Sequence, residues 1–124
     1  MTAQTIPARQ LAFHLERRPN FLIVALRGEA SFDHAVEISA RLLQIPLDGY
    51  SLVVLELVEL TFISSRSIRA LFEFSRGLRQ RGVEVRLANV QAPVWQALEV
   101  AGLWRLFEPM ELEQPTRPPA MAVD

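Results

Sequence analysis

Three serines and an arginine form the part of the sequence best equipped for chemistry: Ser64, Ser65, Arg66 and Ser67. They follow an apolar stretch and precede a pattern typical of an amphipathic helix, so Ser64 or Ser65 is expected to cap the first amides of that helix. A phosphate on Ser65 would also lie at the helix N-terminus, with Arg66 and Arg69 close by. The cluster is therefore predicted both as a helix cap and as a candidate site for serine phosphorylation.

Histidine and acidic residues suggest two further kinds of site, a metal site and a hydrolase triad, and the sequence disfavours both. Asp33 and His34 are adjacent, a spacing that rarely lets both side chains bind one metal, and cysteine is absent. Ser64 or Ser65 with His34 and Asp33 would supply the residue types of a hydrolase triad, but no Gly-x-Ser-x-Gly turn surrounds either serine. Neither glycine-rich phosphate-binding motif occurs. The sequence thus predicts no enzyme, no metal site and no cofactor, and Asp33 is expected to cap a helix.

Length and composition indicate one globular domain around these residues. The chain has 124 residues, of which 50% are hydrophobic and 22% are charged, close to the average for globular domains. Its net charge is −1, all of its basic residues are arginine, and no basic run predicts nucleic-acid binding. The longest apolar block, Phe21 to Leu26, is too short to span a bilayer, and the first residues lack a signal-peptide pattern. We therefore expect a cytoplasmic protein that does not insert into a membrane.

Hydrophobic periodicity predicts the elements that must position the serines. Strands are predicted over 11–16, 21–26, 51–57 and 83–88, and helices over about 34–44, from the serine cluster to Gly82, and over 93–101. The first two strands would pair antiparallel, and later strands would join in parallel through the helices. The sequence therefore predicts an α/β domain with a mixed four- to five-stranded β-sheet and helices packed on it.

Three local details of this fold are also predicted. Gly28 is expected to end the second strand. Arg69 and Glu73 stand at i, i+4 on the second helix and are expected to form a weak ion pair. The aromatic residues are expected in the core, and Phe74 is the candidate exception, expected to be the one nearest the surface, because it falls off the apolar stripe through Leu71 and Phe72.

The domain is expected to occupy residues 11–113. Residues 1–10 are polar or small and are expected to fray. The apolar segment 103–107 is expected to pack on the core. Residues 114–124 contain several prolines without periodicity and are expected to be disordered.

Six segments, taken together and in order, resemble the STAS domains, the fold of the anti-sigma factor antagonists. These segments are Leu26-Arg27-Gly28-Glu29, Leu52-Val53-Val54-Leu55-Glu56-Leu57, Phe62-Ile63-Ser64-Ser65, Ile68-Arg69-Ala70-Leu71, Arg81-Gly82-Val83 and Gly102-Leu103-Trp104-Arg105-Leu106-Phe107. They cover about residues 11 to 110. The resemblance implies a single STAS-like domain.

The resemblance also implies a function in bacterial signalling. Antagonists of this family bind an anti-sigma factor that is also a serine kinase of the GHKL type, which frees the sigma factor and so affects transcription. The kinase phosphorylates a serine in an Asp-Ser-Ser/Thr-Gly motif at the start of the second helix, and binding is lost. Ser65 stands at the phosphorylated position, whereas Ser64, Arg66 and Ser67 depart from the motif. Partner contacts are accordingly implied for Ser64, Ser65, Arg66, Ser67 and Arg69, with partner switching by phosphorylation of Ser65.

The altered motif leaves a second function open, that of a STAS scaffold subunit without a switch. Similar domains occur in stressosome-like complexes and in complexes associated with ABC transporters. The partners of such a subunit would be other STAS proteins, a second copy of the chain, or transporter subunits.

Overall fold

An antiparallel hairpin of β1 (Ala12–Arg17) and β2 (Leu22–Ala30) begins the computed structural model. Pro19 and Asn20 lie in the connecting turn, where a fixed φ and local hydrogen bonding favour them. The structure describes residues 11–47, 49–102 and 108–110. The predictions for the two chain ends, 1–10 and 114–124, and for the apolar segment 103–107 lie outside the described residues.

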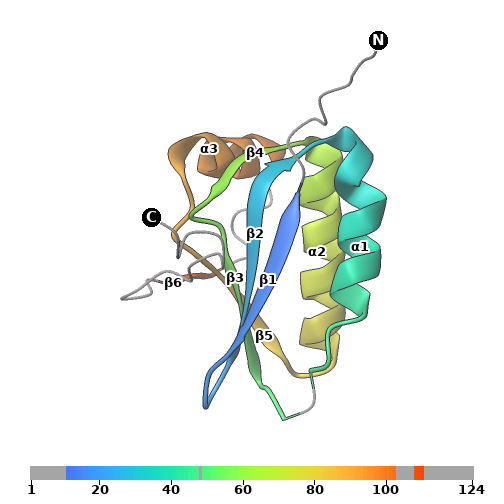
Figure 1. The fold of residues 1–124 in the computed structure, drawn as a ribbon, viewed down its shortest axis with the longest axis vertical. Helices are drawn as coiled ribbons and strands as arrows, with labels where there is room; N and C mark the ends of the chain where they lie inside the picture. Colours follow the sequence, from blue (N-terminus) through green and yellow to red (C-terminus); the bar gives the residue numbers. More distant parts are fainter. Residues whose placement is uncertain (1–10, 48, 103–107, 111–124) are drawn as a thin grey trace.

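The remaining strands run parallel to β2, and helices connect them except between β3 and β4 (Figure 1). The elements are η1 (Phe32–His34, a 3₁₀ turn), α1 (Ala35–Leu43), β3 (Leu52–Glu56), β4 (Leu60–Ile63), α2 (Ser65–Gln80), β5 (Glu84–Ala88), α3 (Ala92–Ala101) and β6 (Glu108–Met110). The strand order is β1-β2-β3-β5-β6, and β4 pairs with β2. The predicted mixed sheet is confirmed, and β4 and β6 extend it beyond the four strands that periodicity predicted.

The long strand β2 changes its partner at Gly28. From Leu22 to Ala25 it pairs with β3, and from Gly28 to Ala30 it pairs with β4. Gly28 has a φ of 103°, and the register shifts between Gly28 and Glu29. The prediction that Gly28 ends the strand was wrong, because glycine adopts this φ freely and the strand continues beyond the bulge. The continuation aligns β4 and so places the start of α2.

Helices α1 and α2 lie side by side on one face of the sheet, and α3 lies near β4 at the end where α2 begins (Figure 1). The main core fills the space between the sheet and the two helices, where Leu26, Ile38, Leu55, Ile68 and Leu71 are almost completely buried. No helix among the described residues is long and apolar enough to cross a membrane. The predicted arrangement of helices packed on a mixed sheet is therefore confirmed.

The core face of α2 is broader than the sequence pattern indicated. Phe74 is only 8% exposed, whereas Phe72 is half-buried. Ser67, Leu71, Phe74 and Leu78 repeat at i, i+4, i+7 and i+11, so all four side chains face the core. The expectation that Phe74 lies nearest the surface was therefore wrong.

The ion pair expected on α2 also differs from the one observed. Glu73 Oε1 lies 3.9 Å from Arg76 Nη1, at i, i+3, and Arg69 has no carboxylate within salt-bridge distance among the described residues. Both spacings place side chains on neighbouring positions of a helix surface. Because Glu73 pairs with Arg76 instead, Arg69 keeps an exposed positive charge near the start of α2.

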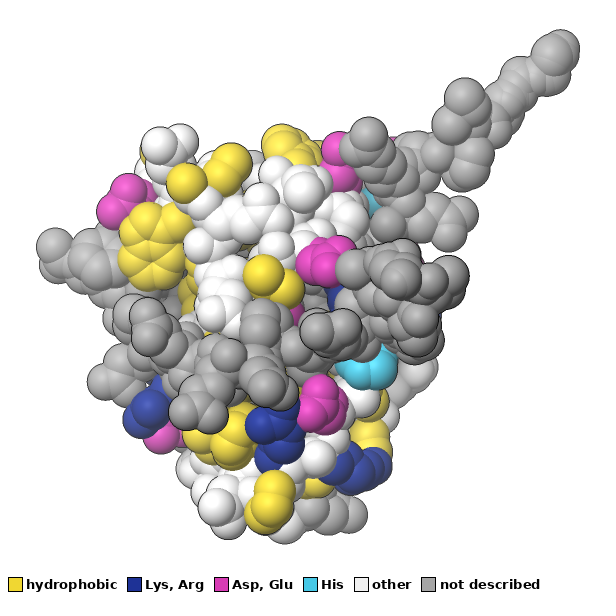
Figure 2. All heavy atoms as spheres, turned by 60° about the vertical axis from the view of Figure 1, so that its left-hand side comes forward, with side chains coloured by type: hydrophobic (Ala, Val, Ile, Leu, Met, Phe, Trp, Pro, Cys, Tyr) yellow, Lys and Arg dark blue, Asp and Glu magenta, His cyan; other side chains and the backbone are white. Residues whose placement is uncertain are grey.

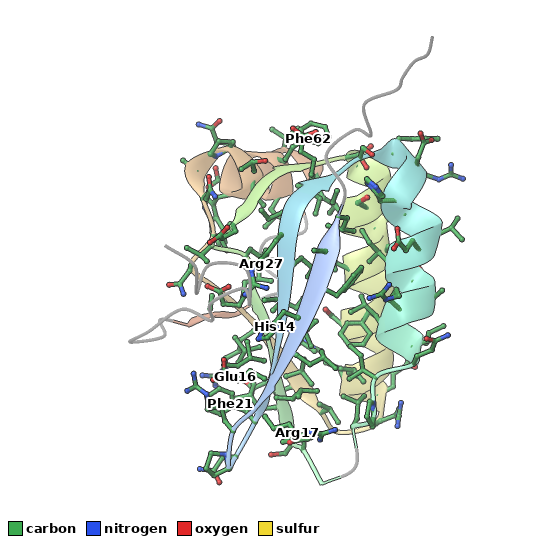
Figure 3. The ribbon with its side chains drawn as sticks, viewed as in Figure 1. His14, Glu16, Arg17, Phe21, Arg27 and Phe62 are labelled. Carbon is green, nitrogen blue, oxygen red and sulfur yellow. The ribbon has the colours of Figure 1, made fainter. Side chains whose placement is uncertain are left out.

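The other face of the sheet carries a buried charged cluster. Arg27 is 8% exposed and Glu56 is 1% exposed, and Asn89 Nδ2 donates a hydrogen bond of 3.0 Å to Glu56 Oε2. Figure 3 shows Arg27 on the side of the sheet away from α1 and α2. Burial lowers the pKa of Arg27, while the carboxylates of Glu59 and Glu56 act in the opposite direction. The hydrogen bond joins β3 to the loop after β5, and the charge of Arg27 on β2 interacts with that of Glu56.

Paired charges continue along the same face toward the β1–β2 turn. Arginine and acidic side chains lie next to one another in the lower part of Figure 2. Arg18 pairs with Glu16, and Arg86 Nη2 lies 2.9 Å from Glu84 Oε2. Pairs that reach the solvent in this way contribute little to stability, about 0–1 kcal/mol each.

Candidate functional site

The serine cluster begins where the extension of β2 holds the end of β4. Ala30 pairs with Ile63 at the last position of the two strands. The Ser64 amide then donates a hydrogen bond of 2.8 Å to the carbonyl oxygen of Ala30. The β2–β4 pairing therefore determines where the chain leaves the sheet and enters α2.

Ser64 is the N-cap of α2. Its backbone is extended, with φ −80° and ψ 160°, and its side-chain oxygen accepts a hydrogen bond of 3.1 Å from the Ser67 amide. The Ser64 carbonyl accepts from the Ile68 amide at 2.9 Å, the first hydrogen bond of the helix ladder. The predicted cap is thus confirmed at Ser64, while Ser65 is the first helical residue and not the cap.

Ser67 ties the cap to the loop after β2. Its side chain is completely buried. Its hydroxyl accepts a hydrogen bond of 3.2 Å from the Ser64 hydroxyl and donates one of 3.0 Å to the Ser31 carbonyl. A direct partner contact by Ser67 would need an exposure that this side chain lacks, so its part in the site is to hold α2 against the segment that leads into α1.

Ser31 and His34 close the neighbouring turn. The Ser31 amide donates a hydrogen bond of 3.1 Å to His34 Nδ1, and the Ser31 hydroxyl lies 2.9 Å from the same nitrogen. Asp33 is exposed and lies within η1, whose N-cap is Ser31. The expectation that Asp33 caps a helix was therefore wrong, because the chain makes a 3₁₀ turn before α1 and Ser31 begins that turn.

Ser65 is exposed at the start of α2, and its hydroxyl makes no hydrogen bond within the described part of the chain. Arg66 and Arg69 are also exposed, and Arg69 follows Ser65 at i, i+4 on the same side of the helix. Ser65 and both arginines are therefore exposed within the first turns of α2.

Two aromatic side chains that the sequence did not single out border this surface. The Arg66 guanidinium carbon lies 4.5 Å from the centre of the Phe32 ring, an arrangement typical of a cation–π contact. Phe32 is 59% exposed and Phe62 is 48% exposed. Figure 3 places Phe62 at the end of the molecule where α2 begins. Exposed aromatic and arginine side chains are enriched in protein interfaces, so their position supports a binding surface.

His34, considered above with the serines, is hydrogen-bonded to the turn that precedes α1. His34 Nδ1 accepts its hydrogen bond from Ser31, and no hydrogen bond joins His34 to Ser64 or Ser65 among the described residues. The described residues also contain no group of three or more histidine or acidic side chains that could hold a metal ion.

Replacing Ser64 by alanine is expected to lower the free energy of unfolding by about 1 kcal/mol, because the Ser67 amide would lose its acceptor. Urea denaturation would measure this loss. Ser65→Ala is the matched control, and we expect its effect to stay within about 0.5 kcal/mol because the side chain is exposed. Equal losses for the two variants would contradict the assignment of Ser64 as the cap.

The chain matches a known protein family. The family model described as "STAS domain" matches residues 12–116. The search of curated proteins finds no match.

Solved structures share the fold at low sequence identity. An anti-sigma factor antagonist from Mycobacterium paratuberculosis, known from a crystal structure, shares 16% sequence identity with this chain. The two structures have a TM-score of 0.72 over 97% of each chain. The Bacillus cell fate determinant SpoIIAA in its phosphorylated form is 18% identical, with a TM-score of 0.60 over 90% of this chain and 96% of that one. The STAS domain of a SulP transporter from Vibrio cholerae is 20% identical, with a TM-score of 0.60 over 79% of each chain.

The family match spans both the sheet and all three helices, including the β4–α2 junction that carries the serine cluster. The sequence resemblance stated above is therefore confirmed at the level of the family. The protein belongs to the STAS domain family.

Proposed function

We propose that this protein is an anti-sigma factor antagonist-like regulator that binds an anti-sigma factor with serine kinase activity of the GHKL type. One observation carries the proposal: Ser65 is exposed with an unused hydroxyl, while the hydroxyls of Ser64 and Ser67 are engaged in the fold. A kinase could thus modify Ser65 without unfolding the helix cap. The similarity to antagonist structures supports the same function.

Phosphorylation of Ser65 would act as an electrostatic switch. The unmodified serine is small and neutral, so a partner can pack closely on the start of α2. A phosphate adds a charge of about −1.5 to −2, which a closely packed interface must desolvate. Arg69, one turn along, and Arg66 would neutralise part of that charge from within the chain. Binding of the kinase, and with it control of a sigma factor and of transcription, would fall when Ser65 is modified.

We further propose that the protein acts through binding and not as an enzyme. The proposal is supported by two of the side chains named above for a hydrolase triad, since Ser64 and His34 each hold a structural hydrogen bond. The cytoplasm is the compartment that the sequence favours for this role, and it is where such a kinase would meet the chain.

Recovery of tagged protein from its host, followed by mass spectrometry of the partners and of Ser65, tests the proposal. A GHKL-type kinase among the partners and phosphate on Ser65 would support it. Recovery of transporter or stressosome subunits with Ser65 unmodified would refute it.

A scaffold subunit of a stressosome-like or ABC-transporter-associated complex is the alternative that one observation favours. Ser67 fills the position where the antagonist motif has glycine, and its buried hydroxyl is committed to Ser31. A helix start fixed in this way suits permanent assembly with other STAS proteins or with a second copy of the chain. The same recovery experiment decides between the two functions.

A further inference from the structure

The exposed side of α3 carries an apolar stripe next to the polar residues Gln96 and Glu99. Pro93, Val100 and Ala101 are exposed and Ala97 is half-buried, and these residues repeat at i, i+4, i+7 and i+8. Val100 is 90% exposed, and Glu99 is the single charged residue of α3. An exposed apolar stripe of this kind on a helix is typical of a contact with a second neighbour.

A groove runs between this face and the beginning of α2. Its volume is about 400 Å³, at the lower end of the range for ligand pockets. Ile63 and Ile68, 4% and 2% exposed, provide its floor. From α3 it is lined by Ala97 and Val100, together with the polar Gln96. Ser65 lies on its lining as well. The candidate phosphorylation site therefore stands at the edge of an apolar groove.

The arginines next to Ser65 indicate the charge of a partner segment that would bind in this groove. Arg66 and Arg69 are exposed and have no carboxylate within salt-bridge distance among the described residues. Arg41 and Arg76, by contrast, each lie within salt-bridge distance of a glutamate on their own helix. The two arginines beside Ser65 thus leave positive charge available to an acidic partner.

We propose that the α2–α3 groove receives an aliphatic side chain from a partner segment that also carries acidic residues, which contact Arg66 and Arg69. This proposal rests on the proposed function, since the partner is the kinase that binds at Ser65. The groove supplies the buried apolar anchor that strong interfaces concentrate in a few positions. The arginines fix the direction in which the segment lies.

The position of Ser65 gives the groove a role in the switch. A phosphate at the groove edge would place charge beside an apolar anchor, where desolvation is costly. It would also compete with the acidic residues of the partner for Arg69. A single modification would therefore disturb both parts of the contact.

The test of the groove compares two exposed valines. Val100→Glu places a charge at the groove, and Val36→Glu places the same charge on α1, where Val36 is 75% exposed. Binding of each purified variant to the purified GHKL-type kinases of the host would be measured by calorimetry. We expect Val100→Glu to weaken binding at least 10-fold and Val36→Glu to leave it within 2-fold, with unchanged circular dichroism for both.

Each outcome of this comparison has a separate meaning. If the wild type binds a kinase and the two variants bind it equally well or equally poorly, the groove is not the anchor site, although the proposed function stands. If the wild type binds none of the kinases, the proposed function fails and the groove proposal fails with it.

Charge reversal tests the acidic nature of the partner segment. Arg69→Glu should weaken binding at least 10-fold and reduce its dependence on salt, while Arg76→Glu, further along the same helix, should change binding less than 2-fold. Unchanged or stronger binding by Arg69→Glu would contradict the proposal that the partner segment is acidic.

Discussion

Glutamate in place of Ser65 is expected to weaken binding of the GHKL-type kinase about 100-fold, which corresponds to about 2.7 kcal/mol. The side chain is exposed at the first residue of α2, beside Arg66 and Arg69, so the change adds charge and bulk to the centre of the proposed contact. Burial of an unmatched charge in an interface costs this much or more. Calorimetric titration of the purified kinase with each variant would measure the loss.

Two controls separate this effect from a general effect of charge. Ser65→Ala should bind within about 2-fold of the wild type, because the hydroxyl makes no hydrogen bond that the described residues would lose. Ser51→Glu adds the same charge at an exposed serine just before β3 and should also bind normally. If Ser65→Glu bound like these controls, phosphorylation of Ser65 could not act as a switch.

Replacement of Phe74 by alanine is expected to cost about 3–5 kcal/mol of folding free energy, the usual loss for a buried phenylalanine. Phe74 lies in the main core with Leu71 and Leu78, although the sequence pattern placed it nearest the surface. Such a loss is a large part of the total stability of a domain of this size, about 5–15 kcal/mol. Urea denaturation monitored by circular dichroism would measure this loss of folding free energy.

Phe72 provides the matched comparison for Phe74. It is the same residue type on the same helix, but half-buried, so Phe72→Ala is expected to cost only about 1–2 kcal/mol. A larger loss for Phe72→Ala than for Phe74→Ala would mean that α2 is rotated about its axis in solution relative to the arrangement described above.

The main elements could be predicted because each is a strongly patterned segment. The run from Leu52 to Leu57 is apolar almost throughout, and such runs are typical of buried parallel strands. Strand β4 was not predicted, because it has four residues and only Leu60 and Ile63 are buried, which is not the alternation of a half-buried strand. The continuation of β2 past Gly28 was missed for a related reason, since a bulge and an end look alike in a sequence.

The site was predicted only where it depends on neighbours in the chain. Ser64 and Ser65 could be placed because a cap and the first turn involve adjacent residues. The burial of Ser67 depends on a hydrogen bond to Ser31, which lies 36 residues earlier, and no local pattern contains that contact. The contact of Arg66 with Phe32 likewise joins two segments that only the fold brings together.

The central position of β2 has a consequence for how the chain folds during synthesis. Its hairpin with β1 is local and can form within microseconds. Its parallel partners β3 and β4 come about thirty residues later in the sequence. At a synthesis rate of about 5–20 residues per second, β3 and β4 leave the ribosome a few seconds after the apolar residues of β2. During that interval β2 presents an open apolar edge, so chaperone binding and misassociation are expected to concentrate on residues 22–30 of the nascent chain.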